Sequence, residues 1–250
     1  ALKGNRMIQQ IGPDGREEFV RRLGRTPFFS PVMAASFAVN AGKNTGVRFF
    51  LADGTAVLSV SGDSALVCGE VCDAEELDSF LAFSGVRCVR TSHAAPSGFV
   101  REEIFLMTYT QPQTREFPSG MRLEEMPRMT KLGESMRYTD GTMSSDDFIA
   151  EACARRNRGL AHIFALEAPD GYAATAGVYA LCAHEAYLGG VVTREEYRGR
   201  GCAGALVLYA ANRYAPGRAV RLICAPERRT FYESIGFSAG RDVMQWRAGQ

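Results

Sequence analysis

The segment that most constrains the fold is residues 187–214, where an apolar run enters a glycine-rich loop followed by a helical pattern. The run YLGGVVT has the composition of a strand, and the loop REEYRGRGCAG follows it directly. Beyond the loop, apolar residues recur at the spacing of one helix face, at Ala203, Leu206, Val207 and Ala210. The segment therefore predicts a strand, a glycine loop and a helix that ends before Pro216-Gly217.

The loop has the chemistry of an anion site. A helix N-terminus offers unpaired N–H groups and about half a positive charge. Gly199 and Gly201 allow the backbone to turn those groups toward one centre, and Arg198 and Arg200 add charge beside it. We interpret the loop as a cradle for pyrophosphate. A glycine-rich turn with solvated arginines is the alternative, and neither the P-loop nor the dinucleotide-binding pattern matches its spacing.

A linker divides the chain into two similar halves. Residues 111–120, QPQTREFPSG, combine two prolines and a glycine with polar residues. Each half contains the order strand, hairpin, strand, helix, strand, with hairpin turns predicted at Asp53-Gly54 in the first half and Asp170-Gly171 in the second. The helix of the first half begins after Asp73. This repetition of elements, rather than of residues, predicts an internal duplication.

Bulk properties exclude several classes of protein. The net charge of +1 gives no general attraction to nucleic acid or to an anionic membrane. No apolar stretch approaches the roughly 18–20 residues that span a bilayer, and the first residues lack the apolar region of a secretory signal. Seven scattered cysteines, an odd number, favour reduced thiols over a disulfide framework and form no zinc pattern. We expect a cytoplasmic protein without a bound metal.

Two motifs resemble the GNAT superfamily of N-acetyltransferases. Residues 198–203, RGRGCA, match its R/Q-x-x-G-x-G/A loop, in the required place between a strand and a helix. About thirty residues later, FYESIGF at 231–237 matches the second signature of the family. The resemblance covers roughly residues 120–250.

The resemblance implies a fold class and a division into domains. It implies an α/β (α+β) protein with two tandem GNAT-like folds, each a mixed, mostly antiparallel sheet flanked by helices. The catalytic domain would be residues 120–250, and residues 1–112 would be a degenerate copy, because the sequence VCDAEELDSF replaces the glycine loop there with acids. Tandem proteins of this kind, such as the glycine N-acyltransferase-like group, also carry one active half.

The resemblance also implies which residues bind acetyl-CoA. The backbone of the strand before the loop would pair with the pantetheine chain, and the N–H groups of the loop would hold the pyrophosphate. The cofactor-binding residues are then Val191, Val192, Thr193, Arg198, Gly199, Arg200, Gly201, Cys202 and Ala203. One feature departs from the family, because Ala225 stands where many members carry an asparagine that contacts the cofactor.

Three residues are catalytic candidates. Tyr232 matches the usual general acid of the family, although a tyrosine that only anchors the core is the alternative. In family members that use a glutamate as general base, that glutamate lies near the position of Tyr187 here. Glu185, two residues earlier, lies on the same face by strand alternation, whereas His184 points to the other. Each could equally be a residue at the end of a hairpin, and many members use no dedicated base. We expect direct attack rather than an acyl intermediate on Cys202, because no histidine stands beside it.

The expected activity is acetyl transfer from acetyl-CoA to a primary amine in a ternary complex. The acceptor would lie between Tyr187 and the helix expected at 145–158, and a small molecule is expected rather than a protein. The sequence leaves open the acceptor, the acyl chain and whether the protein forms a homodimer. The alternative is a non-catalytic CoA-binding sensor or scaffold, which the intact loop and Tyr232 disfavour.

Overall fold

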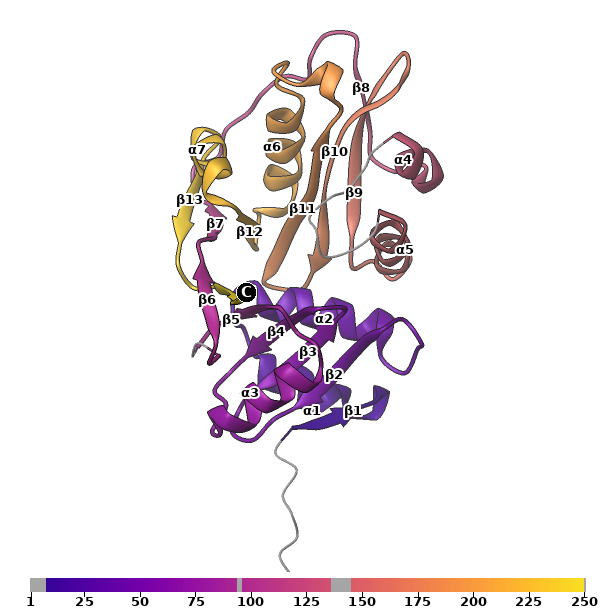
Figure 1. Ribbon diagram of the computed structural model, residues 1–250. Helices are drawn as coiled ribbons and strands as arrows, with labels where there is room; N and C mark the ends of the chain where they lie inside the picture. Colours follow the sequence, from indigo (N-terminus) through magenta and orange to yellow (C-terminus); the bar gives the residue numbers. More distant parts are fainter. Residues whose placement is uncertain (1–7, 94–95, 136–144, 250) are drawn as a thin grey trace, which may run out of the picture. The chain divides into compact units, whose positions relative to one another are not determined.

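A computed structural model describes residues 8–93, 96–135 and 145–249 of the chain (Figure 1). The chain divides into two compact units, of which the first contains Ala1–Ile104 together with Arg241–Gln250, and the second contains Phe105–Gly240. The two units are described in turn.

The first unit is built on one sheet. Its described elements are β1 (Gln9–Ile11), the short 3₁₀ helix η1 (Pro13–Gly15), α1 (Arg16–Leu23), α2 (Phe29–Asn40), β2 (Val47–Leu51), β3 (Val57–Ser61), β4 (Ser64–Cys68), α3 (Ala74–Phe83), β5 (Cys88–Thr91), β6 (Phe99–Glu102) and β14 (Met244–Ala248). The strands lie in the order β1-β2-β3-β4-β5-β14-β6. Only the β4–β5 pair is parallel among these neighbours.

The second unit repeats this arrangement. Its described elements are β7 (Phe105–Tyr109), β8 (Arg122–Glu124), α4 (Met129–Ser135), α5 (Ser145–Arg156), β9 (His162–Ala168), β10 (Gly171–Leu181), β11 (Glu185–Thr193), the 3₁₀ helix η2 (Glu195–Tyr197), α6 (Cys202–Tyr214), β12 (Ala219–Cys224), α7 (Pro226–Ser234) and β13 (Phe237–Gly240). The strands lie in the order β8-β9-β10-β11-β12-β7-β13. Here the β11–β12 pair is the parallel one.

The two sheets have the same topology strand for strand, which confirms the duplication in element order. In each sheet the sixth position is filled by an exchanged strand, since β7 follows β6 in the chain but joins the second sheet, and β14 follows β13 but joins the first. The compact units therefore differ from the division at 1–112 and 120–250 expected from the sequence. The composition of residues 111–120 marks a loop, but it carries no information on which sheet a neighbouring strand joins.

Burial of the predicted helix face explains why α6 forms against the second sheet. Leu206, Val207 and Ala210 are completely buried in a core shared with strands of that sheet. The alanines and Gly204 of α6 have little side chain, so the helix packs closely against β10 and β11. This close packing holds the loop at the start of α6 against the end of β11.

The helix expected in the first half begins where the sequence indicates. The carboxylate of Asp73 accepts a hydrogen bond from the backbone N–H of Glu76 at 3.0 Å, which is the geometry of an N-cap. The cysteines are all free, and burial differs among them from Cys68, which is buried, to Cys72, which is exposed. Within the described ranges, every helix is too short or too polar to cross a bilayer.

The single tryptophan of the chain gives a stability test of the exchanged strand. Trp246 on β14 pairs with Val89 and Arg101 and packs against the core of the first unit. Because it is half-buried, we expect Trp246→Ala to lower the free energy of unfolding of that unit by about 2 kcal/mol. Urea denaturation followed by circular dichroism measures this loss. An unchanged midpoint would mean that the Trp246 side chain contributes nothing to the first core.

Candidate active site

The site begins where two parallel strands separate. β11 and β12 pair only from Glu185 with Ala219 to Tyr187 with Arg221, and beyond this point the strands diverge. A bulge in β11 follows, because Gly189 pairs with Gly177 and the next recorded pair joins Val192 to Thr175. The bulge contains Gly190 at φ 58°, and a side chain there would collide with the ring of Tyr179. The sequence thus opens the sheet at this point.

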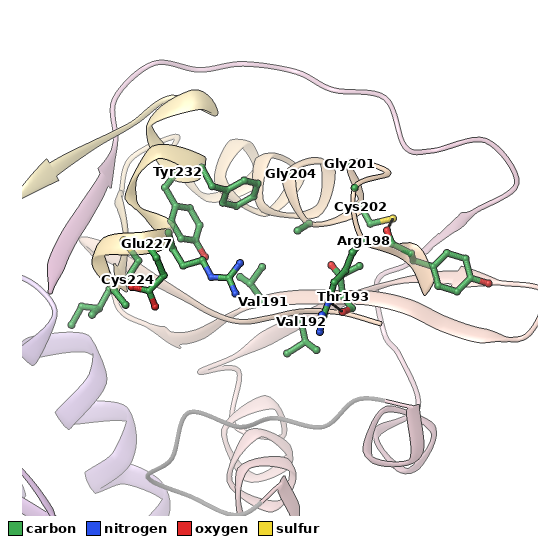
Figure 2. Close-up of a pocket in the computed structure, with 17 residues that line it drawn as sticks. Val191, Val192, Thr193, Arg198, Gly201, Cys202, Gly204, Cys224, Glu227 and Tyr232 are labelled. Carbon is green, nitrogen blue, oxygen red and sulfur yellow. Dashed lines mark hydrogen bonds between the residues drawn. The ribbon is translucent and has the colours of Figure 1, made fainter. Parts of the chain in front are cut away.

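A cavity of about 860 Å³ occupies this opening. It is lined by Val191, Val192, Thr193, Tyr197, Arg198, Gly199, Gly201, Cys202, Ala203, Gly204, Ile223, Cys224, Ala225, Glu227, Arg228, Phe231 and Tyr232. Figure 2 shows Gly201, Arg198 and Thr193 at one end, and Tyr232, Cys224 and Glu227 at the other. The cavity therefore joins the glycine loop to the second sequence motif.

The loop end has the geometry expected for an anion cradle. Gly199 lies at φ 75°, and Gly201, the N-cap of α6, lies at φ 82°, both in the left-handed region that favours glycine. The first N–H groups of α6 have no partner within the helix and form the positive end of its dipole. Arg198 donates from Nε to the carbonyl of Thr193 at 3.4 Å, whereas Arg200 lies over the ring of Tyr197 and does not line the cavity.

Tyr232 occupies the other end on α7. Its side chain is 8% exposed and packs edge-on against Phe231 and Phe237. Burial, together with the nearby Cys224 thiol and the phenol of Tyr187, raises the pKa of Tyr232 well above its ordinary value. Within the described part of the chain no group forms a hydrogen bond with its hydroxyl. The phenol therefore keeps its proton at neutral pH and is free to donate it into the cavity.

The two base candidates lie outside the cavity lining. Glu185 is completely buried and forms an ion pair with Arg221, so its carboxylate is engaged. Tyr187 pairs in register with Arg221, and its phenol is close enough to Tyr232 to influence the pKa there. Arg221 forms the ion pair with Glu185 and stands directly opposite Tyr187, so the side chains of Glu185 and Tyr187 lie on the same face of β11. The other face of β11 carries Ala186 and Leu188, which belong to the core beneath α6.

The thiol of Cys202 is unsuited to nucleophilic attack. The residue is buried at the start of α6, and burial raises the pKa of the thiol. A reactive cysteine needs thiolate character, which a raised pKa suppresses. Its Sγ lies 3.6 Å from the sulfur of Met121 and 3.7 Å from the carbonyl oxygen of Tyr197. Cys202 therefore serves as a small, buried residue where the loop enters α6.

Several lining residues had no sequence signal. Arg228 and Glu227 come from the first turn of α7, and Ile223 and Cys224 come from the end of β12. Phe231 both packs against the core and lines the cavity. Only the divergence of β11 and β12 brings these residues to the site. The sequence did offer one indication of these residues: two parallel strands flank α6, and ligands bind at the carboxyl ends of such strands.

The corresponding place in the first unit is different. A cavity of about 330 Å³ lies at the ends of β4 and β5, lined in part by Glu70, Asp78 and His93. The N-terminus of α3 is capped by Asp73, and Glu75 and Glu76 stand in its first turn. These carboxylates occupy the helix end that would otherwise attract phosphate. Among the residues that the structure describes, no cluster of three potential metal ligands occurs in either unit.

Comparison with known proteins agrees with this architecture. Residues 159–239 match the family model described as an acetyltransferase (GNAT) domain. A tandem GNAT protein from the clavulanic acid biosynthesis pathway, described as without AcCoA, has a similar structure with a TM-score of 0.62, at 13% identity, over 97% of this chain and 98% of that one. No curated protein matches the sequence.

Two further structures are similar over most of their length. A GCN5-related N-acetyltransferase from Sphaerobacter thermophilus has a TM-score of 0.58 at 15% identity, covering 96% of this chain and 93% of that chain. A GCN5-related N-acetyltransferase-like protein from Streptococcus suis has a TM-score of 0.55 at 14% identity, covering 95% and 99%. At such identities the likeness shows the fold.

The match to the GNAT domain model lies within the second unit and contains both sequence motifs. With its duplicated sheets, the whole chain is a tandem GNAT-fold protein.

Proposed function

We propose that this protein transfers an acetyl group from acetyl-CoA to a primary amine, with the second unit alone carrying the reaction. The observation that carries the proposal is the continuous cavity between the glycine loop and Tyr232. One end offers N–H groups to phosphate, and the other offers a protonated phenol. A cavity of this size is suited to a cofactor-sized ligand.

The residues of the cavity fit acetyl-CoA. The N–H groups from Gly199 to Ala203 would hold the pyrophosphate, with Arg198 as an added charge. From Leu188 onward β11 forms no recorded pair with β12, so backbone groups of Val191–Thr193 on that edge would hydrogen-bond with the amides of the pantetheine chain. The Thr193 carbonyl already accepts a hydrogen bond from Arg198. Ala225 lines the same cavity but has no polar side chain, so any contact there is through its backbone.

The chain's own groups supply the rest of the chemistry. Acetyl-CoA supplies a thioester, whose carbonyl carbon accepts the amine nitrogen as the carbon–sulfur bond breaks. Tyr232 donates its proton toward the sulfur that leaves. The proton lost by the amine passes to water, since Glu185 is engaged by Arg221, and Tyr232 regains a proton from water. Tyr187 is close to Tyr232, and its side chain lies on the face of the sheet that α6 does not cover. We expect the acceptor amine to approach from that face.

The direct test is a panel of primary amines incubated with acetyl-CoA, with release of free thiol as the readout. Acetylation of at least one amine, dependent on Tyr232, is the expected result. Tight binding of acetyl-CoA with no turnover across small amines, amino acids and peptides would instead favour a non-catalytic CoA-binding protein.

We predict that each chain binds one acetyl-CoA. The first unit lacks a glycine cradle, its helix end is capped by Asp73, and its cavity is much smaller. Isothermal titration calorimetry should therefore give a stoichiometry near one. Two equivalent sites per chain would contradict the assignment of cofactor binding to the second unit.

A further inference from the structure

An arginine of the linker reaches the glycine loop. Arg115 belongs to the segment between β7 and β8, which Figure 1 shows running past α6. A Cβ built on Gly204 would lie 2.7 Å from Nη1 of Arg115, and one built on Gly201 would lie 4.0 Å from the same atom. Gly201 and Gly204 both line the cavity, whereas Arg115 itself does not, so the guanidinium lies beside the glycines that form the rim.

The guanidinium of Arg115 has no counter-charge there. Within the described ranges it forms no hydrogen bond and no ion pair, whereas Arg194 pairs with Asp170 and Arg213 with Glu125. It lies instead at the positive end of the α6 dipole, where a cation is unfavourable. Arg198 and Arg200, in the glycine loop before α6, add further positive charge nearby. This arrangement leaves positive charge uncompensated at the rim of the cavity.

The same contact explains a glycine that the helix would otherwise avoid. Glycine within a helix costs about 1 kcal/mol relative to alanine. Gly204 lies in the first turn of α6, and its φ is not positive, so the backbone there does not require glycine. The near neighbours of an added Cβ are the guanidinium of Arg115 and, at 3.8 Å, the Ile235 side chain. A side chain at 204 would displace the guanidinium from the rim.

We propose that Arg115 binds a phosphate group of the cosubstrate, so that the linker forms part of the cofactor site. This inference rests on the proposed function. A guanidinium forms strong, charge-assisted hydrogen bonds with phosphate oxygens. In CoA two phosphate sources share this chemistry, the pyrophosphate and the 3′-phosphate, and both would be near the start of α6 if the pyrophosphate occupies the cradle.

The test measures CoA binding to Arg115→Ala by isothermal titration calorimetry. Loss of one charge-assisted contact at an exposed site should weaken binding about 10-fold. Arg115→Lys should retain part of the affinity, because it keeps the charge. Arg128→Ala is the matched control, since Arg128 is also exposed and belongs to the same unit, but it is not among the nearest neighbours of Gly201 or Gly204. That control should bind CoA as the parent protein does.

Titration with 3′-dephospho-CoA separates the two phosphate sources. If Arg115→Ala weakens binding of CoA but not of 3′-dephospho-CoA, the partner is the 3′-phosphate. If it weakens both equally, the partner is the pyrophosphate. Equal affinity of the Arg115→Ala and parent proteins for both ligands would overturn the inference.

A double-mutant cycle tests the explanation of Gly204. Gly204→Ala should weaken CoA binding in the parent protein and have a smaller effect when Arg115 is already alanine. Equal effects in both backgrounds would remove the link between these residues. A parent protein that binds no CoA would refute the proposed function itself, whereas normal binding by Arg115→Ala refutes only this inference.

Discussion

Replacing Tyr232 by phenylalanine should lower kcat by about 10²–10⁴-fold, the usual contribution of a general acid. The ring remains, so its packing against Phe231 and Phe237 is retained. The hydroxyl forms no hydrogen bond within the described residues, so its loss leaves no buried partner unsatisfied. The change therefore removes the proton donor and little else. Steady-state kinetics with the best amine from the panel measures the effect.

The split between kinetic constants makes this result specific. Loss of an interaction made only in the transition state lowers kcat and kcat/KM together, whereas loss of ground-state binding raises KM alone. Affinity for acetyl-CoA should stay close to that of the parent. Tyr209→Phe is the matched control, because its hydroxyl bonds to Glu125 and does not line the cavity. A kcat within a few-fold of the parent would make Tyr232 a core residue only.

The pKa of Tyr232 adds a test of pH dependence. Burial raises this pKa above the ordinary value of 10.0, so the phenol stays protonated through the neutral and mildly alkaline range. Deprotonation of Tyr232 should therefore cause no loss of kcat below about pH 10. A fall in kcat of the parent with a midpoint near pH 8, absent from Tyr232→Phe, would contradict the raised pKa.

Local patterns were sufficient to predict the two ends of the site. The glycines at 199 and 201 indicate a positive φ and a helix start, which depend on the loop itself, and the structure has both. Tyr232 could be chosen from the motif around it. The base candidates show the limit of this approach, because alternation gives the face of Glu185 but not its partner. Arg221 is 36 residues away in sequence, and only the pairing of β11 with β12 brings them together.

The same limit applies to the fold. The order of elements predicts the duplicated sheets, because each helix and hairpin leaves its own periodic pattern. The exchange of β7 and β14 leaves no such pattern in the sequence, because an apolar strand could pack into either sheet equally well. Arg115 is a similar case. In the sequence it lies in a polar linker, and its position over Gly204 follows from the path of that linker past α6.

Replacing Gly201 by glutamate should weaken acetyl-CoA binding more than about 100-fold while the protein remains folded. The carboxylate would stand at the start of α6, where the phosphate is expected, and would repel it. An acid at a helix N-terminus interacts favourably with the helix dipole, which offsets part of the strain of a side chain at φ 82°. Calorimetric titration with acetyl-CoA and thermal unfolding measure the two effects separately.

Two control variants separate charge from backbone strain. Gly201→Gln has the same shape and the same strain without the charge, so it should weaken binding less than Gly201→Glu does. Gly217 lies at φ 81° in open space after α6, so Gly217→Glu imposes similar strain outside the cavity and should leave binding unchanged. If the glutamate and glutamine variants at 201 bind equally well, steric fit rather than phosphate charge governs the loop. If Gly201→Glu binds as tightly as the parent, the phosphate lies elsewhere and the loop is an ordinary turn into α6.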